Sequence, residues 1–191
     1  AHTKQFYNSM IVLGNGAGTY LKRQLVPFGE YTPLKKLFLP LANYINIPMS
    51  DLSPGPWRQP PLSAAGIAIA PFICYEIAYP IKALNSINNK QVIVAISDDS
   101  WFGNSTASSQ QLQIAQMRAL ETGRYLFYGN NTGITAIIGP HGKLISVAPT
   151  NKQIVLTGTA QAINGKTPLM RWNYYPVLGI IALFLVLAAI F

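Results

Sequence analysis

Short apolar runs alternate with polar turns from the start of the chain to about residue 160, and neither a linker nor an internal repeat interrupts them. This pattern predicts one α/β domain, in which helices pack on a sheet. Strands are indicated by short apolar runs that end at turn residues. They fall at 6–13, 66–73, 91–97 and 154–160, and a hairpin is formed by 134–138 and 143–147.

Apolar residues recur at helical spacing at 109–122, and Gly123 directly after this segment is a typical helix stop. Weaker helical patterns cover 34–44 and 77–84, and a proline interrupts the second. Five prolines at 48–62 exclude regular structure there and predict a long surface loop. Long ordered loops are often functional.

The chain ends in an unbroken apolar run at 177–191, which has no polar face. About 20 apolar residues are needed to cross a bilayer, so a run of 15 residues is slightly short. We interpret it as a transmembrane helix, 176–191, that is cut where the sequence stops. A buried core helix is the alternative, which the lack of an amphipathic pattern disfavours. Aromatic residues before the run suit a membrane interface, namely Trp172, Tyr174 and Tyr175.

The expected organisation is therefore a folded domain at 1–165, a juxtamembrane segment at 166–175 and the helix at 176–191. The sequence begins without an initiator Met or a signal segment, and a strand pattern follows at once. We therefore expect the domain to be entered partway through.

The chain carries 14 Lys and Arg against six Asp and Glu, a formal charge of +8. Such a balance raises nucleic acid as a partner. The basic residues are scattered, however, and form no dense stripe, so we expect no nucleic-acid partner. Attraction to anionic lipid headgroups fits the C-terminal helix better, and a merely solvated surface is the alternative.

Cys74 is the only cysteine, and it directly follows the strand pattern at 66–73. A single thiol forms no intramolecular disulfide, so it serves either packing or chemistry. Free cysteine is often a small buried hydrophobe. The end of a buried strand, by contrast, delivers its residue to the edge of the sheet, where ligands bind. Both interpretations are open on these residues alone.

A cysteine nucleophile needs a base or a cation nearby. The two histidines are poor partners, because His2 lies at the start of the chain and His141 in the hairpin turn. Lysine and glutamate are the remaining helpers. Asp98 and Asp99 follow the strand at 91–97, but no third ligand is spaced to join them. Turn roles are therefore expected for them rather than a metal site.

Six further segments stand at an ordered spacing. They are Tyr20 to Tyr31, Ser53 to Pro56, Phe72 to Glu76, Ser97 to Gly103, Met117 to Arg124 and Gly133 to Ala136. Together they resemble the nitrilase, or carbon-nitrogen hydrolase, superfamily over essentially the whole chain. More narrowly, they are similar to its bacterial membrane branch, whose members acylate lipoproteins. The C-terminal apolar run is expected of that branch and not of soluble nitrilases.

The resemblance implies a nitrilase-like α-β-β-α sandwich, incomplete at its N-terminus and followed by the transmembrane helix. It also implies a Glu-Lys-Cys triad. Cys74 matches the nucleophile, Lys22 the lysine that stabilises the oxyanion, and Glu30 a second glutamate that supports the site. Tyr75 and Glu76 match the pair after the nucleophile, with the backbone N–H of Tyr75 as an oxyanion donor. We expect the first glutamate of the triad, the general base, to lie upstream of this sequence.

The function that the resemblance implies is an acyl transfer in two steps. A fatty acyl chain would pass from a phospholipid to a thioester on Cys74, and then to the α-amino group of the N-terminal diacylglyceryl-cysteine of an apolipoprotein. The expected setting is the inner membrane of a Gram-negative bacterium, in a multi-pass protein with its catalytic domain on the periplasmic side. No cofactor or metal is implied. Trp57, Trp101 and Phe102 are candidate contacts for the acyl chain, with core packing or lipid contact as the alternative.

Other interpretations stay open. An amidase of the same fold would use water as the acceptor, although a lipid-spanning segment argues against it. An inactive fragment or a membrane-anchored binding module is compatible with the missing glutamate, and this chain alone is expected to be inactive. Taken singly, Lys22 is typical of a solvated residue and Glu30 of a helix cap. Two departures from the family pattern concern the substrate side, namely Gln111 in place of a histidine and Thr132 in place of an asparagine.

Overall fold

The computed structural model describes residues 5–33, 52–103, 105–149 and 152–190. Its centre is a seven-stranded sheet with the strand order β2-β4-β5-β6-β7-β8-β9, in which β5, β6 and β7 are parallel and the other neighbours antiparallel. The elements are β1 (Ser9–Ile11), β2 (Gly16–Ala17), β3 (Thr19–Leu21), β4 (Leu62–Ala64), β5 (Ile67–Ile73), η2 (Cys74–Ala78), α2 (Pro80–Ile87), β6 (Val92–Ser97), η3 (Ser100–Phe102), α3 (Ala107–Thr122), β7 (Leu126–Asn130), β8 (Ala136–Ile138), β9 (Leu144–Val147), α4 (Pro168–Trp172) and α5 (Tyr175–Ile190).

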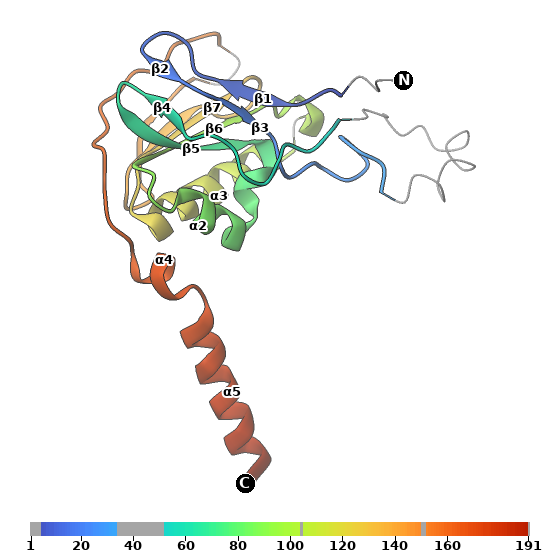
Figure 1. The fold of residues 1–191 in the computed structure, drawn as a ribbon, viewed down its shortest axis with the longest axis vertical. Helices are drawn as coiled ribbons and strands as arrows, with labels where there is room; N and C mark the ends of the chain where they lie inside the picture. The colour runs from blue at the N-terminus through green and yellow to red at the C-terminus, as the bar shows by residue number, and fades with distance from the viewer. Residues whose placement is uncertain (1–4, 34–51, 104, 150–151, 191) are drawn as a thin grey trace, which may run out of the picture.

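Two further layers cover the faces of this sheet (Figure 1). The helices α2 and α3 lie on one face, and the two-stranded antiparallel sheet of β1 and β3 lies on the other. Successive side chains of β5 point to opposite faces of the sheet, so this strand contacts both layers. Ala70 and Phe72 pack in the core under the helices, whereas Ile69 and Ile73 pack with residues of β1 and β3. Three of the four layers of the predicted sandwich are therefore present among the described residues, and a second helical layer is not found there.

Local signals predicted several elements well. The helix predicted at 109–122 is α3, and Gly123 ends it in the left-handed conformation, with φ of +60°. Its N–H donates to the carbonyl of Ala119, which is the usual way in which glycine closes a helix. The predicted hairpin is present as β8 and β9. The prolines keep residues 53–61 free of regular structure, while the predicted helix at 34–44 lies outside the described residues.

One predicted element differs in its bounds, and another is wrong. The helix expected at 77–84, with Pro80 as its interruption, is divided at that point into the 3₁₀ turn η2 and the helix α2, in which Pro80 takes the first helical position. A proline is tolerated there because that N–H has no partner within a helix. The strand expected at 154–160 is absent from the described structure. A Cβ added to Gly158 would lie 2.6 Å from the Ile137 side chain, so this segment crosses the face of the sheet and does not pair with its edge.

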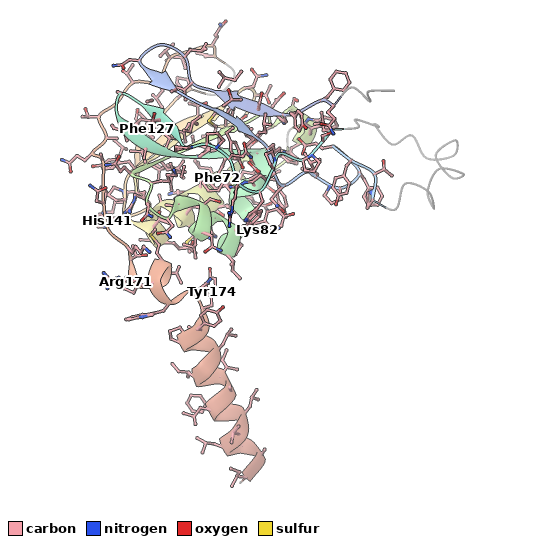
Figure 2. The ribbon with its side chains drawn as sticks, in the orientation of Figure 1. Phe72, Lys82, Phe127, His141, Arg171 and Tyr174 are labelled. Carbon is pink, nitrogen blue, oxygen red and sulfur yellow. The ribbon has the colours of Figure 1, made fainter. Side chains whose placement is uncertain are left out.

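The C-terminal helix α5 projects from the domain, and its side chains are exposed along its whole length (Figures 1 and 2). It contains 16 residues. Within the part of the chain that the structure describes, no helix is both long and apolar enough to cross a membrane. The predicted C-terminal helix is thus present as Tyr175–Ile190, but its membrane crossing is not supported by these residues.

Candidate active site

The end of β5 places Cys74 in a sharp turn. Cys74 is the first residue of η2, and its φ of +55° is unusual for a residue with a side chain. Strain of this kind clusters at functional sites, where a strand-to-helix turn can present a nucleophile. The parallel neighbour β6 runs in register, with Ile96 beside Ile73, so the residues that follow both strands meet at one edge of the sheet.

Lys22 directly follows β3 and is only 1% exposed. Its ammonium lies 2.8 Å from each carboxylate oxygen of Glu30. Glu30 also accepts hydrogen bonds from the backbone N–H of Val26 at 2.9 Å and from the side-chain amide of Asn8 at 3.2 Å. A buried ammonium needs such a partner, so Lys22 is a paired, immobilised cation and not the solvated residue that its sequence context alone suggests.

Cys74 and Glu30 line the same cavity, which has a volume of about 840 Å³. Small-molecule sites commonly measure about 300–1,000 Å³ and combine apolar walls with a few polar groups. The lining residues are Asn8, Val26, Pro27, Phe28, Gly29, Glu30, Leu52, Ile73, Cys74, Ile96, Ser97, Asp98, Trp101 and Phe102. The structure therefore brings Trp101 and Phe102, two of the predicted acyl-chain contacts, to the cavity of Cys74.

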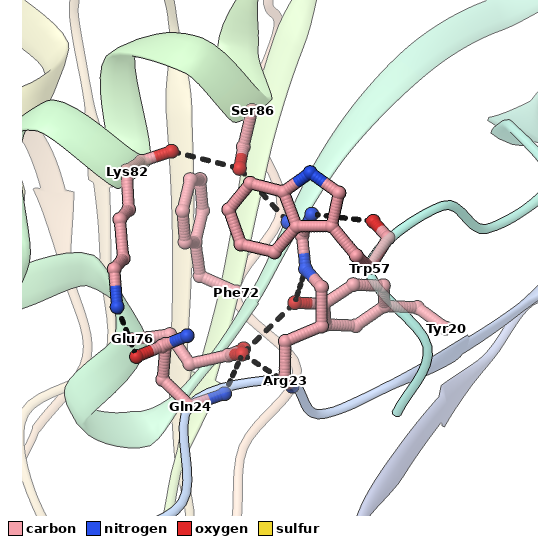
Figure 3. Close-up of a pocket in the computed structure, with 8 residues that line it drawn as sticks. All are labelled: Tyr20, Arg23, Gln24, Trp57, Phe72, Glu76, Lys82 and Ser86. Carbon is pink, nitrogen blue, oxygen red and sulfur yellow. Dashed lines mark hydrogen bonds between the residues drawn. The ribbon is translucent and has the colours of Figure 1, made fainter. Parts of the chain in front are cut away.

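Glu76 lies outside this cavity and is almost fully buried. Its carboxylate accepts four hydrogen bonds from two segments that are far apart in the sequence, and Figure 3 shows the three from Tyr20, Arg23 and Gln24. Oε1 accepts from the hydroxyl of Tyr20 at 2.9 Å and from the backbone N–H groups of Arg23 at 2.8 Å and Gln24 at 3.1 Å. Oε2 accepts from the backbone N–H of Ile73 at 2.9 Å.

These hydrogen bonds make Glu76 a link between the two predicted catalytic residues. Lys22 lies between the donors on its own segment, and Cys74 directly follows the donor on β5. Burial raises the pKa of the Tyr20 phenol, and the charge of Glu76 raises it further, so Tyr20 remains a protonated donor at neutral pH. Glu76 is thus a carboxylate that ties two segments together, and its support of catalysis stays a prediction.

Trp57 is not brought to Cys74. It lines a pocket of only about 20 Å³ together with Glu76, room for roughly one water molecule. The guanidinium of Arg23 lies 5.4 Å from the ring centres of both Trp57 and Tyr20 (Figure 3). This geometry gives Trp57 a cation–π contact beside the segment of Lys22.

Tyr75 is half-exposed, and its ring meets that of Tyr79 edge to face, with the centroids 5.4 Å apart. The side chain therefore packs along η2. The predicted role of Tyr75 uses only its backbone N–H, which belongs to the first turn after Cys74.

A buried polar network lies behind the cavity wall. Gln111 on α3 accepts hydrogen bonds from the hydroxyl of Tyr128 at 2.9 Å and from that of Ser97, a cavity residue, at 3.3 Å. Burial raises the pKa of the Tyr128 phenol, which keeps it a donor. Gln111, which departs from the family pattern, therefore holds the cavity residue Ser97 by a hydrogen bond from outside the cavity. In the described ranges, no three His, Cys, Asp or Glu side chains are grouped so that they could hold a metal ion.

Gly55 is a residue whose role the sequence alone did not reveal, although it lies in the recognised segment Ser53 to Pro56. Its N–H donates to the carbonyl of Lys22 at 2.7 Å. A Cβ at this position would lie 2.5 Å from the carbonyl oxygen of Leu21 and 2.7 Å from its Cβ. Only glycine therefore lets this loop approach the segment that carries Lys22.

We expect Gly55→Ala to lower the free energy of unfolding by about 1 to 3 kcal/mol, the usual cost of overpacking. The backbone of Leu21 cannot move aside without displacing Lys22. Thermal unfolding measures the effect, and Gly179→Ala in α5 is the control, because nothing lies within 4 Å of a Cβ added there. Equal melting temperatures for Gly55→Ala and the control would contradict the close approach.

Residues 1–163 match the family model for carbon-nitrogen hydrolases. The fold agrees with solved structures of that type. The NitFhit protein of C. elegans has a TM-score of 0.55 at 14% identity, over 76% of this chain and 36% of its own. Saccharomyces cerevisiae Nit3, a member of branch 10 of the nitrilase superfamily, has a TM-score of 0.52 at 16% identity, over 71% and 45%. This chain belongs to the carbon-nitrogen hydrolase family and has a nitrilase-like α/β fold.

Within this family, the chain is similar to apolipoprotein N-acyltransferases. The one from Coxiella burnetii is 60% identical over 185 residues, which are 97% of this chain and 38% of that protein. The one from Azotobacter vinelandii is 44% identical over 181 residues, 95% of this chain and 35% of that protein. The resemblance recognised in the sequence is thereby confirmed, and the chain spans little more than a third of the length of these relatives.

Proposed function

We propose that this chain carries the part of an acyl-transfer site that contains the nucleophile, Cys74. The observation that carries the proposal is the strained turn of Cys74 on the wall of a large cavity that also contains Glu30, the partner of the buried Lys22. In this assignment Lys22 stabilises the oxyanion and Glu30 holds its ammonium in place. The backbone N–H of Tyr75 is the second oxyanion donor.

The proposed first half-reaction moves an acyl chain from a phospholipid to Cys74. The thiolate attacks the ester carbonyl, and the oxyanion forms beside the ammonium of Lys22. Collapse expels the lysophospholipid alkoxide, which takes up a proton, and leaves a thioester. A preorganised donor at the oxyanion contributes about 3 to 4 kcal/mol in comparable sites.

In the second half-reaction an amine attacks the thioester. The acceptor is the α-amino group of the N-terminal diacylglyceryl-cysteine of an apolipoprotein. Its nitrogen forms the amide bond and loses a proton, while the bond between carbon and sulfur breaks and returns the thiolate of Cys74. The names of the relatives from Coxiella burnetii and Azotobacter vinelandii support this acceptor over water, which an amidase would use.

We further propose that the general base is a glutamate outside this chain, which corresponds to 35–38% of the length of these relatives. Residues 1–165 then form the C-terminal part of the catalytic domain, and the upstream part of the same protein adds the base and further transmembrane helices. This chain by itself is expected to be inactive.

A membrane setting follows from the chemistry, because both the acyl donor and the lipoprotein acceptor are lipid-anchored. The exposed, wholly apolar surface of α5 supports it, since surfaces of this kind mark contact with lipid or protein. We propose that α5 lies in the inner membrane of a Gram-negative bacterium and that the cavity of Cys74 faces the periplasm.

The proposal is tested by looking for the thioester. The full-length protein incubated with a phospholipid is expected to gain an acyl group on Cys74 that neutral hydroxylamine removes, because hydroxylamine cleaves thioesters and spares oxygen esters. Intact-mass spectrometry detects the adduct, and Cys74→Ala is the control that should carry none. An adduct that persists in Cys74→Ala contradicts the mechanism, and an unacylated protein that hydrolyses a simple amide favours the amidase instead.

A further inference from the structure

Asp98 places a carboxylate on the wall of the Cys74 cavity. It lies beyond the end of β6 as Cys74 lies beyond the end of β5, and these two strands are parallel neighbours with Ile73 beside Ile96. Neighbouring strands are about 4.8 Å apart, so the two turns stand side by side at one edge of the sheet. Both residues line the same cavity.

Among the residues that the structure describes, Asp98 has no partner cation comparable to that of Glu30. Glu30 has the ammonium of Lys22 at 2.8 Å. Asp98 forms no ion pair with any residue that the structure describes. Its Oδ1 accepts hydrogen bonds from the backbone N–H of Ser100 at 3.0 Å and from the hydroxyl of Thr132 at 3.1 Å, which are both neutral.

This carboxylate is ionised at neutral pH, because the hydrogen bond from the Ser100 N–H lowers the pKa of Asp98 below its usual value. An ionised carboxylate on a cavity wall attracts a cation. A metal ion is a poor fit, since no suitable group of three ligands occurs among the described residues. Trp101 and Phe102 line the same cavity, so the fitting cation is one attached to an apolar chain.

We propose that Asp98 binds the primary ammonium group of an amphiphilic substrate beside Cys74, an inference that rests on the acyl transfer proposed above. Two sources share this chemistry. One is the α-ammonium of the lipoprotein acceptor, because an α-amino group with a pKa of about 8 is largely protonated at neutral pH. The other is the ethanolamine headgroup of a donor phospholipid. Asp98 collects and orients the ammonium, and the proton leaves before the amine attacks.

Binding is tested first without any chemistry, in full-length protein that carries Cys74→Ala. Dodecylammonium and dodecanol are titrated below their micellar concentrations, and calorimetry gives the affinities. We expect the ammonium to bind about five- to tenfold more tightly than the alcohol, which is the usual net worth of one hydrogen bond. Asp98→Asn should remove this preference, because asparagine keeps an acceptor for Ser100 but carries no charge. If the preference for the ammonium over the alcohol is the same with and without Asp98→Asn, the proposal is overturned.

Thr132→Val is the matched control, since it removes a neutral hydrogen bond to Asp98 and leaves the charge. The preference for the ammonium should persist in this variant. A loss as large as that in Asp98→Asn would mean that the shape of the turn matters and not the charge, which also overturns the proposal.

The source of the ammonium is decided in full-length protein that retains Cys74. If the headgroup binds, Asp98→Asn slows thioester formation about five- to tenfold from ethanolamine phospholipids and not from glycerol phospholipids. If the acceptor binds, thioester formation is unchanged and the KM for a lipopeptide with a free α-amine rises by a similar factor. If Asp98→Asn changes neither the rate of thioester formation nor the KM for the lipopeptide, the proposal is overturned. A wild-type protein that forms no thioester contradicts the acyl transfer itself, whereas the titration still decides whether Asp98 binds an ammonium.

Discussion

Replacing Lys22 with methionine is expected to slow thioester formation on Cys74 by about 10²- to 10³-fold, the loss that follows removal of one preorganised oxyanion donor. Methionine fills a similar volume without a charge, so the surrounding walls keep their shape. Quenched-flow sampling of the full-length protein with a phospholipid, read by intact-mass spectrometry, gives the rate. A variant that forms the thioester as fast as the wild type would exclude Lys22 as the oxyanion donor.

Lys22→Met also removes the cation from Glu30, whose carboxylate keeps the donors of Val26 and Asn8. We expect the free energy of unfolding to fall by about 1.5 to 3 kcal/mol, the worth of a hydrogen bond to a charged group. Adding Glu30→Gln should recover much of this stability, because a neutral amide needs no counter-ion, while the rate stays low. Recovery of the rate in the double variant would show that the effect of Lys22 is structural and not electrostatic.

Glu76→Gln is expected to reduce the rate of thioester formation by about 10- to 100-fold, although Glu76 does not line the cavity. Glutamine has one acceptor oxygen, whereas the carboxylate accepts at both oxygens, so either Ile73 or the three donors at Oε1 must face an N–H group. One buried donor left unpaired costs about 1 to 3 kcal/mol. The segments of Lys22 and Cys74 then lose their common anchor, and small displacements in a catalytic site are costly.

Lys82→Met is the matched control for Glu76→Gln. Lys82 lines the same small pocket, and its ammonium donates to the side chain of Gln24 at 2.6 Å and is not among the donors of Glu76 named above. We expect near-normal stability and rate in this variant, because exposed polar contacts contribute little. The alkylation rate of Cys74 by iodoacetamide provides a second readout. If Glu76→Gln lowers only the melting temperature and neither rate, Glu76 serves the stability of the fold alone.

Much of the fold could be predicted because its signals are local. The periodicity of α3 and the glycine that ends it lie within 17 consecutive residues, Ala107 to Gly123. The hairpin of β8 and β9 is likewise a contiguous segment. Where the outcome depends on distant residues, prediction failed. An extended, partly apolar segment at 154–160 suits a strand, but Gly158 rests on the side chain of Ile137 and the backbone pairs with no neighbour in the described sheet.

The candidate site was likewise predictable only in part. Cys74 at the end of an apolar strand was visible in the sequence, as was the order of Lys22, Glu30 and Cys74. The sequence did not reveal that Trp57 contacts Arg23 in a separate pocket. Nor did it reveal that Gly55 must approach the backbone of Leu21, or that Asp98 shares the cavity of Cys74. These relations join residues from different elements, so no spacing along the chain encodes them.

By itself, the sequence determined the family and the strand that leads to the lone cysteine, Cys74, and the family resemblance suggested Lys22 and Glu30 as its helpers. It did so because strand and helix periods are local and because family segments keep their order. Only the tertiary structure decided that Lys22 is a buried cation paired with Glu30, that Glu76 is a link outside the cavity, and that Asp98 lines the same cavity as Cys74. The physical reason is that burial and charge pairing arise only when separate strands are brought together at one edge of a sheet.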